Sequence, residues 1–267
     1  MNFRRVGAVV LRQLYLYRSS PQRVLPLFIW VVLDIVLWGF IARFLGQVSH
    51  STFQFGPALL GAVLLWDFLT RVMQGITTAF FEDVWSRNFM GVFASPMRIS
   101  EYLAGLISIG VSNSLVALVA MYALAWTIFG LSVFSYGVAI LPFLLVLFLT
   151  GMALGVFGAG LVLRLGPASE WLIWPIPTLV APFAGVFYPL SVLPGWMQLI
   201  GRAIAPSYVF SGLRAVVSGH PAPWGDLAIG AALAAAYMVL ACWVFVRIYR
   251  YAIRAGLIAR YSAETVT

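Results

Sequence analysis

Six apolar segments, each at or near the length of a membrane-spanning helix, constrain the fold of this chain more than any other feature. They run over approximately 24–45, 55–81, 103–129, 138–163, 171–188 and 227–246. A helix needs roughly 20 residues to cross the hydrocarbon core of a bilayer. Charged residues make up only 9% of the 267 positions, whereas soluble domains carry about a quarter. The pattern predicts an all-α integral membrane protein with six transmembrane helices and no sizeable soluble domain.

The apolar stretch 181–219 is long enough to cross a bilayer, yet helix-breaking residues interrupt it. They are Pro182, Pro189, Pro194, Gly195 and Pro206. Proline removes a backbone donor, so such breaks are tolerated in a membrane only where protein or a water-filled cavity satisfies the backbone. We expect re-entrant half-helices near 195–204 and 207–217, within 193–217, between the fifth and sixth spans.

The placement of arginine predicts the orientation, because positively charged short loops stay in the cytoplasm. All 16 basic residues are arginine, and the connections 46–54 and 130–137 carry none. The arginines before the first apolar segment, between the second and third, between the fourth and fifth, and after the sixth are Arg4, Arg5, Arg12, Arg18, Arg23, Arg87, Arg98, Arg164, Arg247, Arg250, Arg254 and Arg260. Both termini are therefore expected in the cytoplasm, with 247–267 as a tail. Arg202 and Arg214, after the fifth span, depart from this pattern. A broken region that partly lines a polar cavity tolerates such charges.

Several chemistries are excluded by residues that the chain lacks. It has no lysine, and a Walker A loop uses its lysine to reach the nucleotide phosphates. Schiff-base chemistry is excluded for the same reason. The single cysteine, Cys242, forms no internal disulfide or cysteine-rich metal site, and the two histidines, His50 and His220, flank the apolar segments. We expect no catalytic residue, no metal and no cofactor in this chain.

The first 23 residues place apolar side chains at helical spacing among arginines. These side chains are Val6, Val9, Val10, Leu14 and Tyr17. This pattern predicts an amphipathic helix lying along the cytoplasmic membrane surface. Two interpretations remain open, an anchor that fixes the orientation and a docking element for a partner.

Three charged residues fall within the first two apolar segments. Asp34 lies near the middle of the first, and Asp67 and Arg71 lie one helical turn apart in the second. A charge at that depth costs roughly 2.5–3.5 kcal/mol on insertion scales, so these groups should pair or face a cavity. We expect Asp34 to join the pair if the two helices pack. The cluster either fixes helix packing or serves as a proton relay or substrate contact.

The segment 82–102 is the most polar part of the chain interior. It reads as a helical run, a break at Ser95 and Pro96, and a new helix start, where Ser100 is a plausible N-cap and Glu101 suits the first turn. Such a cytoplasmic segment is either a solvated loop or an element that receives force from a soluble motor. In the fourth apolar segment, Gly151, Gly155 and Gly160 permit close helix approach.

The chain resembles the membrane permeases of type-2 ABC exporters. The resemblance rests on six apolar segments with a cytoplasmic N-terminus and on the sequences EDVWSRN (82–88), ASPMRISEYLAG (94–105), FYPLSVLPGWMQ (187–198) and APSYVFSGLR (205–214). It covers nearly the whole chain and implies one transmembrane domain over 1–267. It also implies a half-transporter that pairs with a separate ABC nucleotide-binding ATPase subunit and with a second permease copy, most simply as a homodimer.

The resemblance further implies where function lies. ATP and Mg²⁺ bind to the partner subunit, and nucleic acid is not a partner. The expected contacts to the ATPase are residues 1–21 and Glu82, Asp83, Trp85, Arg87, Asn88, Ser95, Pro96 and Arg98. The expected extracellular gate comprises Tyr188, Pro189, Pro194, Gly195, Trp196, Arg202, Pro206 and Arg214.

The sequence thus favours a permease subunit of an ATP-driven exporter in the cytoplasmic (inner) membrane of a bacterium. Its substrate class is expected to be drug-like, lipidic or lipid-linked. The alternative is a proton-coupled secondary transporter that uses Asp34, Asp67 and Arg71. A membrane enzyme is disfavoured, because the chain offers no nucleophile next to a general base at membrane depth.

Overall fold

The computed structural model describes residues 2–19, 25–48, 55–85, 97–131 and 133–256, and every regular element in these ranges is a helix. Four described helices are long and apolar enough to cross a membrane, over Ala58–Trp85, Ile99–Phe129, Tyr136–Leu165 and Trp224–Arg254. They correspond to α3 (Phe55–Trp85), α5 (Ile99–Phe129), η2 with α6 (Val133–Ala139 and Ile140–Leu165) and α10 (Trp224–Arg254). The all-α fold class is confirmed for the described part of the chain.

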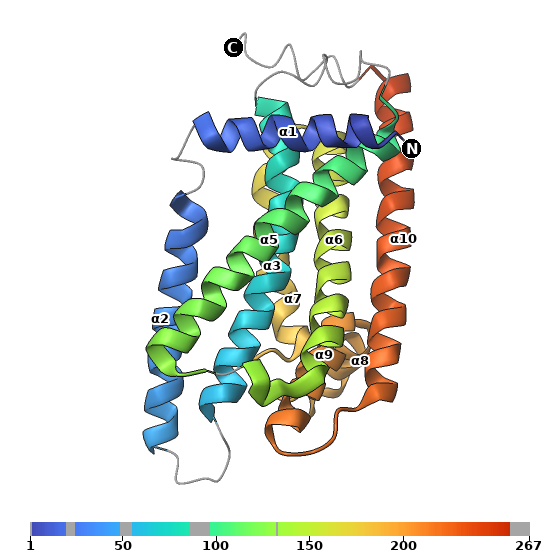
Figure 1. Cartoon of the computed structure of the whole chain (residues 1–267). Helices are drawn as coiled ribbons and strands as arrows, with labels where there is room; N and C mark the ends of the chain where they lie inside the picture. Colours follow the sequence, from blue (N-terminus) through green and yellow to red (C-terminus); the bar gives the residue numbers. More distant parts are fainter. Residues whose placement is uncertain (1, 20–24, 49–54, 86–96, 132, 257–267) are drawn as a thin grey trace.

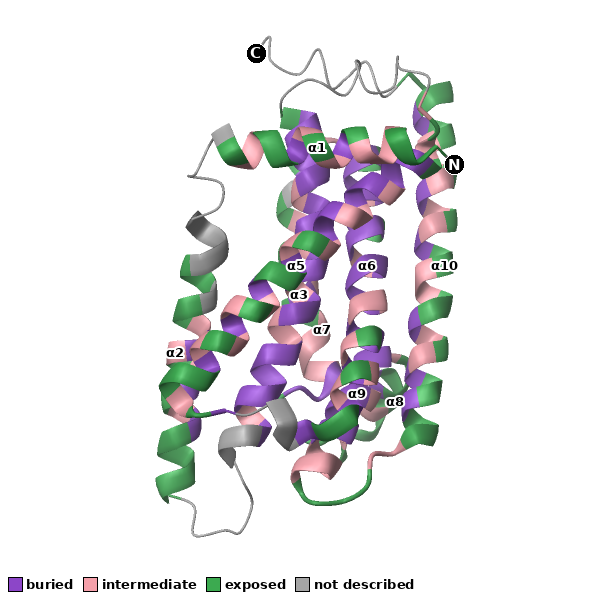
Figure 2. Cartoon of the chain, in the orientation of Figure 1, coloured by how far each residue is buried: buried purple, intermediate pink, exposed green. Residues whose placement is uncertain are grey.

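Helix α2 (Leu25–Val48) stands at one side of the bundle (Figure 1). It has 24 residues and is therefore about 36 Å long, more than the roughly 30 Å of a bilayer core. It contacts α3 and α5. Much of its surface is exposed (Figure 2), as suits a helix that faces lipid.

Helix α3 is the centre of the bundle. It packs against α2, α5, α6 and α9 and is the most buried of the four spanning helices. Glycines on α6 allow this packing: a Cβ added at Gly151 would lie 2.7 Å from the backbone oxygen of Leu69, and one at Gly155 would lie 3.1 Å from that of Met73. The expected close approach of the fourth apolar segment is confirmed at these glycines, whereas Gly160 makes ordinary contacts with α10.

The expected fifth span, 171–188, is not one continuous helix. It contains the end of a 3₁₀ helix, η3 (Pro167–Leu172), and a nine-residue helix, α7 (Ile176–Ala184). Pro175 and Pro177 fix the start of α7, because they suit only the N-terminal turn, and Gly185 ends it with a φ of 62°. Nine residues extend about 14 Å, so α7 does not have spanning length by itself.

Two short helices occupy the ranges expected for the re-entrant half-helices. They are α8 (Gly195–Ala203) and α9 (Ala205–Val217), preceded by the short 3₁₀ helix η4 (Leu190–Val192). Pro194 is the N-cap of α8, and Pro206 lies in the first turn of α9. Both helices lie at the end of the bundle opposite α1 (Figure 1).

The expected N-terminal helix is α1 (Phe3–Ser19), and it lies across one end of the bundle, roughly perpendicular to the long helices (Figure 1). Two of its side chains face the bundle. Val9 and Gln13 are buried, whereas Leu14 is 54% exposed. The polar Gln13 side chain is directed inward, where it donates to the backbone oxygen of Ala79 (3.3 Å).

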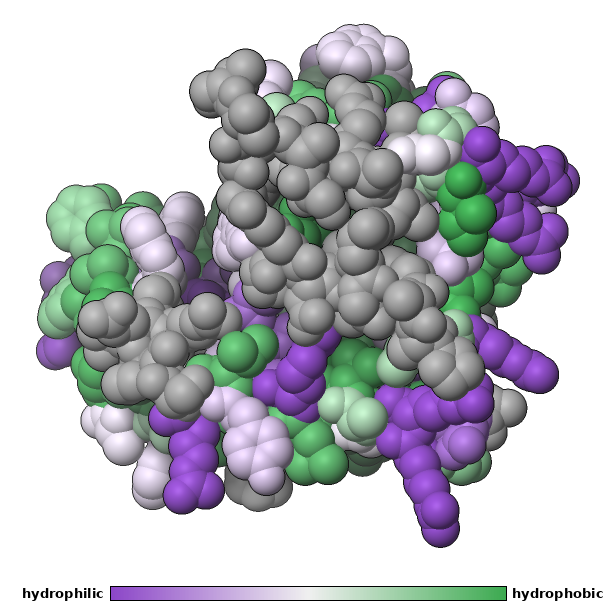
Figure 3. Space-filling model, turned by 90° about the horizontal axis from the view of Figure 1, so that it is seen from above, coloured by the Kyte–Doolittle hydropathy of each residue, from purple (hydrophilic) through white to green (hydrophobic). Residues whose placement is uncertain are grey.

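The arginines gather at the α1 end of the bundle. Nine of the described arginines belong to α1, to the start of α5 or to the last turns of α6 and α10: Arg4, Arg5, Arg12, Arg18, Arg98, Arg164, Arg247, Arg250 and Arg254. Three lie toward the opposite end, Arg43, Arg202 and Arg214. Seen from the α1 end, hydrophilic side chains project around the edge of the molecule (Figure 3).

Candidate functional site

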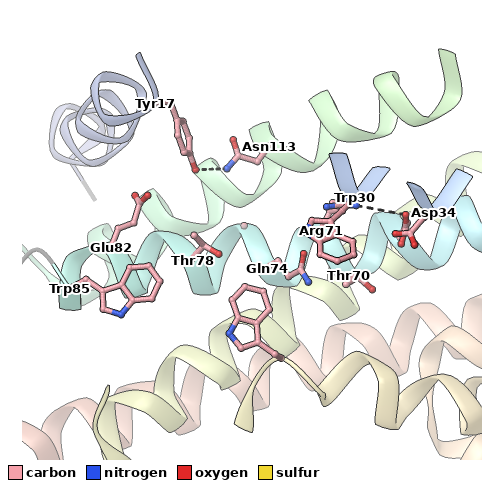
Figure 4. Close-up of a pocket in the computed structure, with 13 residues that line it drawn as sticks. Tyr17, Trp30, Asp34, Thr70, Arg71, Gln74, Thr78, Glu82, Trp85 and Asn113 are labelled. Atoms are coloured by element: carbon pink, nitrogen blue, oxygen red, sulfur yellow. Dashed lines mark hydrogen bonds and ion pairs between the residues drawn. The ribbon is translucent and has the colours of Figure 1, made fainter. Parts of the chain in front are cut away.

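A cavity of about 630 Å³ opens beside α3 and is lined mainly by α2 and α3 (Figure 4). Helices α1 and α5 and the residues just before α7 complete its walls. The lining residues are Tyr17, Trp30, Asp34, Asp67, Thr70, Arg71, Gln74, Gly75, Thr78, Glu82, Trp85, Asn113 and Trp174. Its volume lies in the range of pockets that hold drug-sized molecules, roughly 300–1,000 Å³.

One face of α3 supplies most of the polar lining. Asp67, Arg71, Gln74, Thr78 and Glu82 follow one another at spacings of three or four residues, so they lie in a row along one side of the helix. The row is about 22 Å long at 1.5 Å per residue. Figure 4 shows it running from Glu82, near α1, toward Arg71, near α2.

Sequence reasoning identified the two ends of this polar row but missed Thr70, Gln74 and Thr78 between them. The signal was present, because polar side chains at helical spacing inside a spanning helix indicate a face that does not contact lipid. Each of these uncharged side chains costs little free energy inside a membrane, so none of them is a strong signal by itself.

The structure brings Asp34, Asp67 and Arg71 together at one end of the cavity, as the sequence predicted. Arg71 Nη2 lies 3.9 Å from Asp67 Oδ2, and Asp34 lines the same cavity close to Asp67. The ion pair is too long for a hydrogen bond. Arg71 Nε and Asp67 Oδ2 are both buried with no hydrogen-bond partner among the described residues. The cluster is therefore assembled, but the described side chains do not satisfy all of its polar atoms.

Aromatic rings form much of the remaining wall. Trp30 comes from α2, Trp85 from the end of α3, and Trp174 from the turn before α7. At the α1 end, Asn113 Nδ2 donates to Tyr17 Oη (2.8 Å), a bond that joins α5 to α1 beside the cavity (Figure 4). The site thus combines charged groups with broad apolar surfaces.

Helix α1 is fastened over this site through Asp83. The Asp83 carboxylate forms an ion pair with Arg12 of α1 and accepts a hydrogen bond from Tyr102 of α5 (2.7 Å). Asp83 is only 2% exposed and Tyr102 only 1% exposed. One carboxylate therefore ties α1, α3 and α5 together.

A second carboxylate, Glu101, fastens the beginning of α1. It accepts from the backbone N–H groups of Asn2 (2.8 Å) and Arg98 (3.0 Å) and from Nη1 of Arg5 (3.3 Å). Arg98, and not the expected Ser100, is the N-cap of α5, and Glu101 at N3 caps that N-terminus. Gly105 lets α1 approach, since a Cβ there would lie 2.7 Å from Cβ of Val9.

The predicted ATPase-contact residues divide into three groups. Glu82 and Asp83 are buried, the first against the cavity and the second in the clamp with α1. Trp85 and Arg98 are exposed at the α1 end. Arg87, Asn88, Ser95 and Pro96 lie outside the described residues.

The predicted gate residues lie in or beside α7, α8 and α9. Arg214 Nη1 donates to the backbone oxygen of Gly185 (2.7 Å), and Tyr188 Oη donates to that of Pro182 (3.0 Å). Trp196 packs edge-on against Phe183, 6.4 Å between ring centroids. Pro189, Gly195 and Arg202 are exposed, Pro206 is buried, and Pro194 caps α8. These contacts join the short helices into one unit.

Comparison with known families shows the family of this chain. Residues 4–217 match the family model described as ABC-2 type transporter, which is most of the 267-residue chain. The chain belongs to the ABC-2 type transporter family. Among curated proteins, no match was found. As a member of this family, the protein is a membrane permease component of an ABC transporter, and the family's ATPase activity belongs to another component.

We expect Asp83→Ala to release α1 from the permease bundle. A hydrogen bond to a charged group contributes about 1.5–3 kcal/mol, so losing the Arg12 and Tyr102 contacts should accelerate amide hydrogen exchange in α1 by roughly tenfold or more. Exchange is measured by mass spectrometry on the purified full chain. Asp226→Ala, which removes an exposed carboxylate at the start of α10, is the control. Unchanged protection of α1 in Asp83→Ala would show that the clamp does not hold the helix.

Proposed function

We propose that this chain is the permease subunit of an ATP-driven exporter and forms the substrate pathway as a dimer with a second permease copy. A separate nucleotide-binding subunit, which binds ATP and Mg²⁺, powers it. The observation that carries the proposal is the polar row of α3 facing a 630 Å³ cavity, in a chain of the ABC-2 type transporter family. Polar groups on a spanning helix are costly unless they face protein, water or substrate.

The α1 end is the cytoplasmic end in this proposal, because most of the described arginines lie there. Both termini are then cytoplasmic, in the inner membrane of a bacterium. The broken region with α8 and α9 lies at the extracellular face. The cavity leads from the cytoplasmic end toward the middle of the membrane, so substrate enters from the cytoplasm or the inner leaflet. A drug-like, lipidic or lipid-linked substrate fits this route.

Coupling to the ATPase runs through α1 and the segment 82–98. The exposed groups there, Trp85 and Arg98, make contact with the motor, while the buried Asp83 passes the movement of α1 to α3 and α5. ATP can shift the permease only through a difference in binding between two arrangements. The clamp makes these three helices respond together.

We expect Arg87→Ala combined with Arg98→Ala to uncouple ATP hydrolysis from transport. The assay uses the permease copurified with an ATPase encoded by a neighbouring reading frame, in proteoliposomes, with a compound that stimulates its ATPase activity. Losing a coupling free energy of about 1.4 kcal/mol lowers transport roughly tenfold, while hydrolysis continues. Arg43→Ala with Arg164→Ala, two exposed arginines that belong neither to this segment nor to the gate, should leave both activities unchanged. Undiminished transport by the first variant would remove this segment from the coupling path.

The extracellular gate is formed by α8 and α9 with the end of α7. Arg214 holds α9 against Gly185, so this bond keeps the pathway closed when no ATP is present. We expect Arg214→Leu to let the same compound leak from loaded proteoliposomes without ATP. Arg43→Leu removes the same charge from an exposed position on α2 and should not leak. Equal leakage from both variants, or from neither, would contradict the gate assignment.

A proton-coupled carrier is the second candidate, and the observation that favours it is the close group of Asp34, Asp67 and Arg71 on the cavity wall. The two functions differ in their energy source. We expect the proteoliposomes to transport the compound with ATP when an ionophore has collapsed the proton gradient, and to stop when ATP is withheld. Transport that stops with the gradient at constant ATP would instead establish the carrier.

A further inference from the structure

The charge balance of the cavity lining is opposite in sign to that of the whole chain. The protein has 16 arginines and 8 acidic residues. The described lining of the cavity has the opposite balance, with three carboxylates, Asp34, Asp67 and Glu82, and one guanidinium, Arg71. Arg71 lies beside Asp67, and the three carboxylates outnumber this one guanidinium. Because opposite charges attract, a lining with this balance favours cations over anions.

The rings on the cavity wall favour an organic cation over a metal ion. Trp30, Trp85 and Trp174 line the cavity together with Tyr17. An indole face attracts a cation and also packs against apolar groups. A metal ion needs several oxygen ligands at short range, and among the described residues no group of three His, Cys, Asp or Glu side chains is suited to hold one.

We infer that the substrate is an amphiphilic organic cation. Its charged nitrogen or phosphorus lies near Asp34 and Asp67, where Asp67 Oδ2 is buried without a hydrogen-bond partner among the described residues, and its apolar body lies against Trp30 and Trp174. The 630 Å³ volume accommodates a molecule of drug size. This inference rests on the proposed export function and narrows its substrate class.

The test uses two ions of the same shape and opposite charge. The full-length chain in lipid nanodiscs is titrated separately with tetraphenylphosphonium and with tetraphenylborate, and empty nanodiscs of the same lipid give the blank. The expected result is saturable binding of the cation above the blank and no saturable binding of the anion. Equal binding of both ions, or no saturable binding of the cation, would overturn the inference.

Matched variants locate the binding. Asp67→Asn and Asp34→Asn should each weaken tetraphenylphosphonium binding by about tenfold or more, because each removes a charge partner in a partly desolvated site. Asp226→Asn, at an exposed position outside the cavity, should bind as the unaltered chain does. Trp174→Leu should weaken binding by about threefold, and Trp126→Leu, on the exposed face of α5, should not. Cavity variants that bind like their controls would refute the site.

The comparison of the two ions needs no variant, so it remains decisive if a substitution prevents folding. Binding is measured on the chain alone and without ATP. A negative result would therefore discard the cationic substrate while leaving copurification with the ATPase and ATP-dependent transport to decide the export function. Conversely, cation binding together with transport that follows the proton gradient would support the cavity and reject the ATP-driven exporter.

Discussion

The polar face of α3 is the constraint on which the arrangement of the other helices depends. A spanning helix with Asp67, Arg71 and Glu82 on one side cannot turn that side toward lipid without a large free-energy cost. Its other sides are covered by α5 and α6, which approach closely at glycines such as Gly110 and Gly151. The polar side is then left facing α2, and the cavity lies where these side chains need room and solvation.

The same helix explains why the N-terminal helix lies across the bundle. At its α1 end, α3 carries Asp83, whose carboxylate is almost fully buried. Burying an unpaired carboxylate is costly, and the partners come from two other helices, Arg12 and Tyr102. An amphipathic pattern alone predicts a helix on the membrane surface. The buried carboxylate determines its direction and holds it against α5.

Local sequence signals predicted the local structure of this protein well. Pro194 and Pro206 mark the starts of α8 and α9, because proline suits the first turn of a helix. Helical spacing, with hairpin-like packing of α2 and α3, was enough to bring Asp34 to Asp67 and Arg71. The helix of the fifth apolar segment is shorter than predicted, because Pro175 and Pro177 fix its start and Gly185 ends it after nine residues.

Contacts between distant parts of the chain were beyond the reach of sequence patterns. Nothing near Arg12 indicates Asp83, which lies 71 residues away, and nothing near Trp174 indicates a cavity beside α3. Glu82 and Asp83 looked alike as neighbouring charges in a polar segment. The helix turn separates them by about 100°, which sends Glu82 to the cavity and Asp83 to the clamp.

These separate sites act on one rigid element. Asp83 and Asp67 are 16 residues apart on α3, about 24 Å along the helix axis, and α9 packs against the same helix. A regular helix transmits a rotation or tilt along its length without needing a chain of side-chain rearrangements. In the proposed mechanism, a movement of α1 by the ATPase obliges α3 to follow through the Asp83 clamp, and Asp67 and Glu82 on α3 move relative to Asp34 on α2. On the same proposal, the affinity of the cavity for a cation changes in the step that displaces the packing surface of α9, which is the differential binding that active transport requires.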